Sequence, residues 1–263
     1  MFNILTLNKI SKVGLDKLDP AKYTCSDSVE APDAILVRSA SMHEMTLSPA
    51  TLAIGRAGAG VNNIPVADFG AQGVAVFNTP GANANAVKEL VLCSLFLASR
   101  KVASAVDWCK TLKGEGDAVG KLVEKGKSAF AGPEILGKTL GVIGLGAIGT
   151  LVAEGAKALG MDIVGYNPKL SEERIADLTS KGVKLMSSLD ELYAASDYIT
   201  LHLPLNDSTR GMINGEAIAK MKDGVRILNF ARGELVDSDA LIAALGSGKA
   251  AAYVTDFPTD AQI

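Results

Sequence analysis

Three glycines spaced as GxGxxG are the strongest chemical signal in this chain: Gly144, Gly146 and Gly149. Between a strand and a helix, they would allow a tight turn, close approach of the backbone to a diphosphate, and close packing of the helix on the strand. The first amides of that helix, with Ala147 and Ile148 among them, would then point at the diphosphate. The motif predicts a dinucleotide site.

Asn167 ends the next apolar run, in the segment YNPK. At this position a dinucleotide-binding unit normally presents an acidic side chain to the adenosine ribose. An amide can still bond a hydroxyl, but it does not repel a 2′-phosphate, and Lys169 could attract one. No arginine follows at the position from which it could bind a 2′-phosphate. We therefore expect NAD as the cofactor, with NADP as the alternative.

The elements that must position these residues are short apolar runs bounded by Gly, Asn, Asp or Pro. They predict strands at residues 2–7, 34–39, 52–58, 74–79, 139–143, 162–166, 183–186, 198–204, 225–231 and 250–256. Helices are expected in the gaps, notably at residues 147–159 and 237–246. This alternation predicts an α/β fold of two Rossmann-like, doubly wound parallel sheets with right-handed crossovers.

The two sheets need a connector, and a helical period from Asn85 to about Lys113 supplies one. No Gly or Pro interrupts it, so one long helix is expected. The glycine- and lysine-rich stretch that follows, residues 113–137, predicts a loop. We place the boundary between the domains after residue 97 and expect the ligand between the two units.

Composition narrows the class of protein. The chain has 263 residues, of which 48% are hydrophobic and 5% aromatic, a mixture typical of parallel strands covered by helices. A net charge of −3 with scattered Lys and Arg indicates no basic surface for binding nucleic acid or an anionic membrane. The apolar stretch at residues 90–98 is too short to span a bilayer, and the N-terminus does not resemble a signal peptide. A small-molecule ligand is the default.

The number and spacing of the cysteines indicate whether a metal site is present and which redox compartment suits the chain. Cys25, Cys93 and Cys109 are widely spaced and form no CxxC pair. Neither a disulfide framework nor a metal site is suggested, and a reducing cytoplasm fits best.

Several separated segments, in order along the chain, resemble the D-2-hydroxyacid dehydrogenases. They are VRSAS, NTPGANANAVKELV, FAGPEILGKTLGVIGLGAIG, LHLPLNDSTRGMI and LNFARGELVDSDALIAAL. The closest resemblance is to the members that oxidise 3-phosphoglycerate. It implies a flavodoxin-like substrate domain at residues 1–97 and an NAD-binding domain at residues 98–263. It also implies a homodimer formed through the helix around residues 85–110 and the loop after it.

The resemblance implies NAD-dependent oxidation of 3-phospho-D-glycerate to 3-phosphohydroxypyruvate, the first step of L-serine biosynthesis. The partner would be a small phosphorylated 2-hydroxy acid. Two alternatives stay open. One is a glyoxylate or hydroxypyruvate reductase of the same family, and the other is a non-catalytic NAD-binding interaction protein.

Catalytic and cofactor residues follow from the matched segments. Arg232 matches the family's catalytic arginine, whose fork can hold a carboxylate and a carbonyl together, although an isolated Arg at a strand end is more often a surface ion-pair partner. Asp260 would stand in for the family's glutamate that pairs with the catalytic histidine, in a segment one residue shorter than the family's. The residues that match cofactor contacts, besides the glycine turn and Asn167, are His202, Pro204, Ala231 and Asp256.

Substrate residues follow in the same way. The segment RAGAGVNNI resembles the family's carboxylate loop, in which the amides of Ala59, Gly60 and Val61 would grip an anion; a plain strand-to-helix turn is the alternative. Arg38 and Ser39 match the substrate-facing pair, with Arg38 near the phosphate. Asn83 and Asn85 match the segment bordering the substrate, and helix capping is the alternative for both.

The family's proton donor is a histidine in a segment resembling PHLG, and the chain ends at Ile263 before any such segment. Neither His43 nor His202 matches it. We therefore expect a chain truncated at its C-terminus, in which cofactor binding is favoured over turnover.

Overall fold

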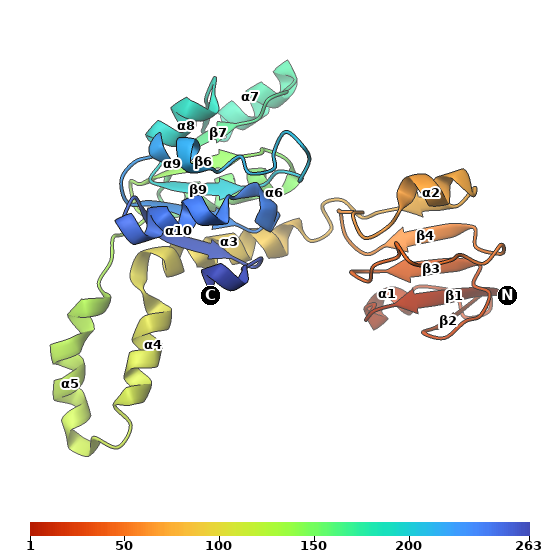
Figure 1. Ribbon diagram of the computed structural model, residues 1–263, viewed down its shortest axis with the longest axis horizontal. Helices are drawn as coiled ribbons and strands as arrows, with labels where there is room; N and C mark the ends of the chain where they lie inside the picture. Colours follow the sequence, from red (N-terminus) through yellow and green to blue (C-terminus); the bar gives the residue numbers. More distant parts are fainter. The chain divides into compact units, whose positions relative to one another are not determined.

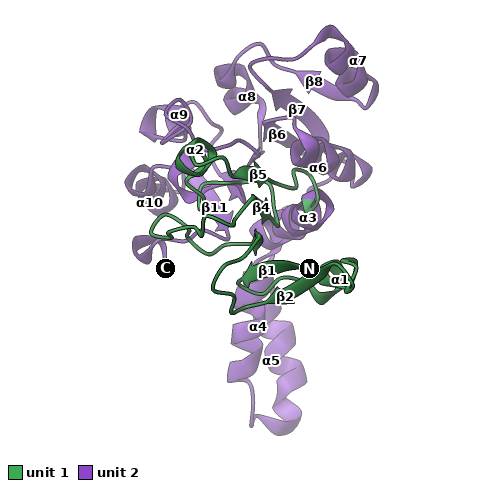
Figure 2. Ribbon diagram, turned by 90° about the vertical axis from the view of Figure 1, so that its right-hand side faces the viewer, with its two compact units in different colours: residues 1–83 green, residues 84–263 purple.

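The computed structural model describes every residue from Met1 to Ile263, in two compact units, Met1–Asn83 and Ala84–Ile263 (Figure 2). The division falls earlier than the boundary expected after residue 97. The reason is the helix α3 (Ala84–Arg100), whose Val91 and Leu95 are buried in the same core as Val152 of α6 (Ala147–Ala158). This helix belongs wholly to the second unit.

Unit 1 is a five-stranded, entirely parallel sheet in the order β2-β1-β3-β4-β5. This is the flavodoxin-like strand order, as expected. Its elements are β1 (Phe2–Leu7), α1 (Lys12–Leu15), β2 (Tyr23–Ser26), β3 (Ala34–Val37), β4 (Ala53–Arg56), α2 (Val66–Ala71) and β5 (Ala75–Phe77). Leu5, Ile35, Ile54 and Phe69 are buried in one cluster that ties the sheet to α2. The sequence did not predict β2, an edge strand without an apolar run.

Unit 2 is a six-stranded parallel sheet in the order β11-β10-β9-β6-β7-β8. Read from β8, this is the Rossmann order 3-2-1-4-5-6, with its topological switch between β6 and β9. The strands are β6 (Thr139–Ile143), β7 (Asp162–Tyr166), β8 (Val183–Leu185), β9 (Tyr198–Leu201), β10 (Val225–Asn229) and β11 (Ala250–Thr255). All were predicted, with differences only at their ends.

Helices cover both faces of this sheet (Figure 1). One buried cluster joins it to α3, α6 and α7 (Glu172–Ser180), and another joins it to α8 (Leu189–Ala195), α9 (Gly215–Ala219) and α10 (Ser238–Ser247). Successive strand residues alternate between the clusters: Val142 belongs to the first and Ile143 to the second. The short 3₁₀ turns η3 (Gly233–Leu235) and η4 (Asp260–Gln262) follow β10 and β11.

The predicted single helix over residues 85–113 is two helices. α3 ends at Arg100, Lys101 takes the left-handed conformation with φ of 46°, and α4 (Val102–Thr111) begins. Contacts from the sheet hold this end: Arg226 Nε donates to the Ala98 carbonyl (3.0 Å), and Ser99 Oγ lies 2.7 Å from the Tyr198 hydroxyl. The interpretation as one helix was wrong because these contacts are distant in sequence.

The stretch predicted as a loop is largely helical. It contains η1 (Gly116–Ala118), α5 (Val119–Gly126) and η2 (Lys127–Phe130). α4 and α5 lie side by side and form a helical arm of unit 2 (Figure 1). The Trp108 and Phe130 rings pack in it with centroids 5.2 Å apart, but no residue of α4 or α5 is buried. No helix in the structure is long and apolar enough to cross a membrane.

Candidate functional site

The glycine turn joins β6 to α6, as predicted. Gly144 has φ of 94°, and a Cβ added there would lie 2.5 Å from the carbonyl oxygen of His202. A Cβ on Gly149 would lie 2.0 Å from the carbonyl oxygen of Gly144. Any side chain at these two positions would force the turn away from β9 or α6 away from β6, so both must be glycine.

Gly146 differs from its two neighbours in the motif. A Cβ added there would meet no atom within 4 Å. The backbone N–H groups of Gly146, Ala147 and Ile148 donate to no acceptor, and no side chain caps α6. Unpaired amides at the positive end of a twelve-residue helix attract an anion. The structure thus brings these amides together in an arrangement that could bind an anion, and their role as the predicted diphosphate contacts stays a prediction.

Asn167 lies against the same turn. Its Oδ1 accepts from the Leu145 N–H (3.2 Å), and its Nδ2 donates to the Lys169 carbonyl (2.8 Å). An aspartate could take the first bond but has no proton for the second. The asparagine is thus explained by the protein's own bonds: it fixes the turn and the loop after β7.

His202 follows β9 and borders the turn through its backbone, because its N–H donates to the Ile143 carbonyl (2.8 Å). Its Nε2 lies 3.0 Å from the hydroxyl of Thr200, which is fully buried. Burial lowers the pKa of the imidazole to about 4. His202 is therefore neutral at pH 7 and adds no charge beside the glycine turn.

Stability should depend on pH through His202. Between pH 6.5 and about 4 the unfolded chain binds a proton that folded His202 does not, so stability falls as pH is lowered. The loss on going from pH 7 to pH 4 is about 3 kcal/mol. We expect the difference in unfolding free energy between the unsubstituted chain and His202→Gln, measured with urea, to change by this amount between pH 7 and pH 4. Parallel pH curves for the two proteins would contradict it.

Arg232 sits in the turn after β10. Its backbone is held by the buried Asn229, whose Nδ2 donates to the Arg232 carbonyl (2.8 Å) and whose Oδ1 accepts from the Ala231 N–H (3.2 Å). Its Nη1 donates to the Ala231 carbonyl (2.6 Å), and the guanidinium lies 6.0 Å from the centre of the Phe257 ring. This arrangement presents a fixed planar cation beside the carboxyl ends of β10 and β11.

Asp256 comes directly after β11 and is electrostatically coupled to Arg232. Desolvation raises the pKa of its carboxyl above the ordinary value, while its own backbone N–H and the charge of Arg232 act in the opposite direction. Pro204 and Asp260, which were also predicted, make fewer contacts. Pro204 is exposed, and its carbonyl accepts from the Thr209 hydroxyl (2.8 Å). Asp260 is exposed at the start of η4 and forms no ion pair.

Unit 1 has its own candidate anion site after β4. The N–H groups of Ala59, Gly60 and Val61 donate to no acceptor in the structure. Asn78 fixes this loop from the neighbouring strand end, with its Nδ2 on the Ala59 carbonyl (2.7 Å). Free amides in a fixed loop suit a carboxylate.

The neighbouring strand β3 ends at the predicted pair Arg38 and Ser39, both exposed. Asn8 holds this strand end, because its Oδ1 accepts from the Ser39 N–H (3.0 Å). Asn83 is the exposed last residue of unit 1, and Asn85 does not cap α3 but bonds Lys88 (2.6 Å) and Glu89 (2.8 Å).

The sequence analysis missed several residues that shape these loops: Asn8, Asn78, Thr150, Arg174 and Asn229. Asn229 had a detectable signal, since it is a polar residue inside an apolar run. Asn8, Asn78 and Arg174 bond residues that are distant in sequence, so they carry no local signal. No group of three or more His, Cys, Asp or Glu side chains is placed to hold a metal ion.

A Rossmann sheet with an open glycine turn, joined to a flavodoxin-like sheet, defines a two-domain dehydrogenase fold. Residues 92–262 match the family described as D-isomer specific 2-hydroxyacid dehydrogenase, NAD binding domain. The chain belongs to this family, and unit 2 carries its NAD-binding domain.

Relatives of known function agree. The chain is 41% identical over 224 residues to a D-3-phosphoglycerate dehydrogenase of Mycobacterium leprae, which covers 84% of the chain and 40% of the relative. It is 42% identical over 236 residues to a hydroxypyruvate reductase of Thermotoga maritima, covering 87% of the chain and 71% of the relative. The chain thus spans about two fifths of the length of the mycobacterial relative.

Solved structures have the same fold. A glyoxylate reductase from Paecilomyes thermophila superposes with a TM-score of 0.80 at 29% identity, covering 100% of the chain and 83% of that structure. A D-lactate dehydrogenase from Aquifex aeolicus, complexed with NAD and lactic acid, gives 0.76 at 28% identity, covering 98% and 77%.

Proposed function

We propose that this chain forms the cofactor-binding and substrate-binding parts of an enzyme that oxidises 3-phospho-D-glycerate to 3-phosphohydroxypyruvate with NAD. The observation that carries the proposal is the pairing of two anion-binding groups at neighbouring strand ends of unit 1. The amides of Ala59, Gly60 and Val61 follow β4, and Arg38 follows β3. Two such groups suit a substrate with a carboxylate and a phosphate. Relatives named D-3-phosphoglycerate dehydrogenase support the same substrate.

Each residue then has a role. The amides after Gly144 bind the diphosphate, and the amides of unit 1 bind the substrate carboxylate. The guanidinium of Arg232 binds the carboxylate or the C2 oxygen and stabilises the negative charge that develops on that oxygen. Bound NAD would accept the hydride that leaves C2, and the hydroxyl proton would pass to a general base, the role that the resemblance gives to the family's histidine. This enzyme would perform the first step of L-serine biosynthesis.

NAD is proposed over NADP. Asn167 and Arg174 are both committed to bonds with the protein. Only the exposed Lys169 remains as a cation near the end of β7, and it has no partner that would fix it for a 2′-phosphate. Preference for NAD therefore comes from the absence of a fixed phosphate clamp.

A hydroxypyruvate reductase is the second candidate, because a relative so named matches 87% of this chain. That reaction needs no phosphate site. The two candidates differ in what Arg38 does.

Replacing Arg38 by Ala should therefore separate them. In the enzyme assayed with NAD or NADH, Arg38→Ala should raise KM for 3-phosphoglycerate about tenfold to a hundredfold by removing a charge-assisted contact. KM for unphosphorylated hydroxypyruvate should not change. Lys22→Ala is the matched control, because Lys22 directly precedes the edge strand β2, whereas Arg38 lies at the carboxyl end of the central strand β3. Equal losses for both substrates would rule out the phosphate role.

We also propose a homodimer formed through the arm. Val102 and Val106 of α4 are about half exposed, at 45% and 51%, and line a groove with Cys109 and Lys110. Burying such a stripe against a second copy would remove apolar surface from water. The three cysteines are free thiols, which suits the proposed reducing, cytoplasmic location.

A further inference from the structure

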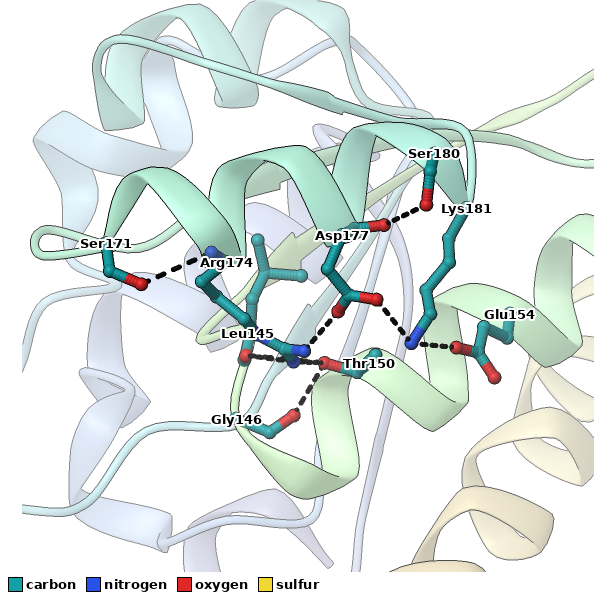
Figure 3. Close-up of polar contacts among 9 residues, drawn as sticks. All are labelled: Leu145, Gly146, Thr150, Glu154, Ser171, Arg174, Asp177, Ser180 and Lys181. Atoms are coloured by element: carbon teal, nitrogen blue, oxygen red, sulfur yellow. Dashed lines mark hydrogen bonds and ion pairs between the residues drawn. The ribbon is translucent and has the colours of Figure 1, made fainter.

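The middle residue of the glycine turn, Leu145, is held by side chains from outside the turn. Its N–H donates to Asn167 Oδ1 (3.2 Å). Its carbonyl accepts from Arg174 Nη2 (3.3 Å) and lies 3.3 Å from the hydroxyl of Thr150 (Figure 3). Both peptide groups of Leu145 are thus fixed by polar bonds.

Arg174 reaches the turn because α7 is built to present it. Ser171 caps this helix by accepting from the Arg174 N–H (3.2 Å). Asp177, one turn further on, accepts from Nη1. Nη2 is then directed at the turn, where it also bonds the Thr150 hydroxyl (2.5 Å). The Arg174 side chain is only 34% exposed, so these bonds are partly shielded from solvent.

The same polar network continues outward to Lys181. Its Nζ pairs with Asp177 (3.2 Å) and with Glu154 on α6 (2.9 Å), and these partners raise the pKa of the ammonium (Figure 3). This outer part joins α7 to α6 but touches no atom of the turn. The Lys181 side chain is 35% exposed, so the two contacts are matched in burial and differ in whether they reach the turn. The chain therefore offers an inner and an outer contact on one helix.

The Leu145 carbonyl matters because it shares a peptide group with the Gly146 N–H. A trans peptide is planar, so its C=O and N–H point in opposite directions. Arg174 holds this carbonyl from the side of α7, so the Gly146 N–H must point the other way. Thr150 on α6 supports the arrangement, because its hydroxyl accepts from the same guanidinium and donates to the Gly146 carbonyl (2.8 Å). The Gly146 N–H has no acceptor in the protein.

We propose that Arg174 is a positioning residue for cofactor binding. By fixing the Leu145 carbonyl, it aims the Gly146 N–H at the diphosphate before the cofactor arrives. The proposal rests on the NAD site at this turn. It assigns to α7 a task beyond covering the sheet: it pre-organises the turn and lowers the cost of ordering it on binding.

The test compares Arg174→Met with Lys181→Met, which removes only the outer contact from the same helix. Calorimetric titration should show NAD binding weakened about tenfold in Arg174→Met, the loss expected for one charge-assisted hydrogen bond, and unchanged in Lys181→Met. ADP-ribose should lose as much as NAD, because the turn faces the diphosphate. Thr150→Val should weaken binding too, and adding it to Arg174→Met should cost little more.

A readout without cofactor completes the test. Amide hydrogen exchange at Leu145 in the unliganded chain should speed up in Arg174→Met and not in Lys181→Met. Equal behaviour of the two variants, or a loss of thermal stability in Arg174→Met with unchanged NAD affinity, would overturn the proposal. If the unsubstituted chain bound neither NAD nor ADP-ribose, the cofactor site itself would be wrong, and the exchange contrast would still decide whether Arg174 holds the turn.

Discussion

Gly146→Ala should weaken NAD binding about a hundredfold while leaving the free energy of unfolding unchanged. The added methyl meets no protein atom within 4 Å, and the φ of −78° suits alanine. It would instead occupy the space into which the diphosphate must come to meet the amides of the turn. Calorimetric titration with NAD and urea unfolding of the same preparation measure the two quantities.

Gly149→Ala should instead act mainly on stability, with a loss of NAD affinity as its consequence. Its methyl would lie 2.0 Å from the Gly144 carbonyl oxygen, a backbone atom that cannot rotate away. Either α6 or the turn must shift, at a cost of about 3 kcal/mol in unfolding free energy.

Gly120→Ala is the control for both variants, because it lies in α5 with no atom within 4 Å of an added Cβ. It should leave NAD affinity unchanged and stability equal or slightly higher. If Gly146→Ala retained wild-type NAD affinity, the diphosphate would not lie on this turn.

Arg232→Gln should lower kcat/KM of the enzyme for 3-phosphoglycerate about a thousandfold. Glutamine keeps the length of the side chain but has neither the charge nor the fork that holds two substrate oxygens. The backbone bonds from Asn229 do not involve the side chain and should persist. Steady-state kinetics with saturating NAD measure the effect.

Arg232→Lys is the matched variant, because it keeps the charge and loses the planar fork. We expect activity between the two, and NAD affinity equal to that of the unsubstituted enzyme in both. A kcat/KM within threefold of wild type for Arg232→Gln would exclude contact with the substrate.

Most of the fold could be predicted because its signals are local. Strands such as β6 and β7 are continuous apolar runs bounded by turn residues, and their alternation with helices dictates parallel sheets. The failures have tertiary causes. β2 is an edge strand recognisable only by its pairing with β1, and the helix break at Lys101 is set by Arg226 and Tyr198 from the sheet.

The residues of the candidate site likewise divide into those with a local sequence signal and those whose contacts depend on the tertiary fold. The three glycines could be predicted because their spacing between a strand and a helix is a local pattern, although the atom that excludes a side chain at Gly144 belongs to His202. Arg174 has no such signal, since its partner Thr150 lies 24 residues away on another helix. Asn167 was recognised as unusual but explained incompletely, because its partner Leu145 lies 22 residues earlier and its role is to fix the turn. The role of Arg38 stays a prediction.

The packing of Trp108 against Phe130 has an experimental consequence. Trp108 is the single tryptophan of the chain, and it lies in the arm, on neither sheet. Its emission spectrum is therefore a native optical label for α4 and α5. Far-UV circular dichroism reports mainly on the two sheets and their helices. A chain that melts at one temperature by fluorescence and at another by dichroism would reveal that the arm and the sheets are separate cooperative units.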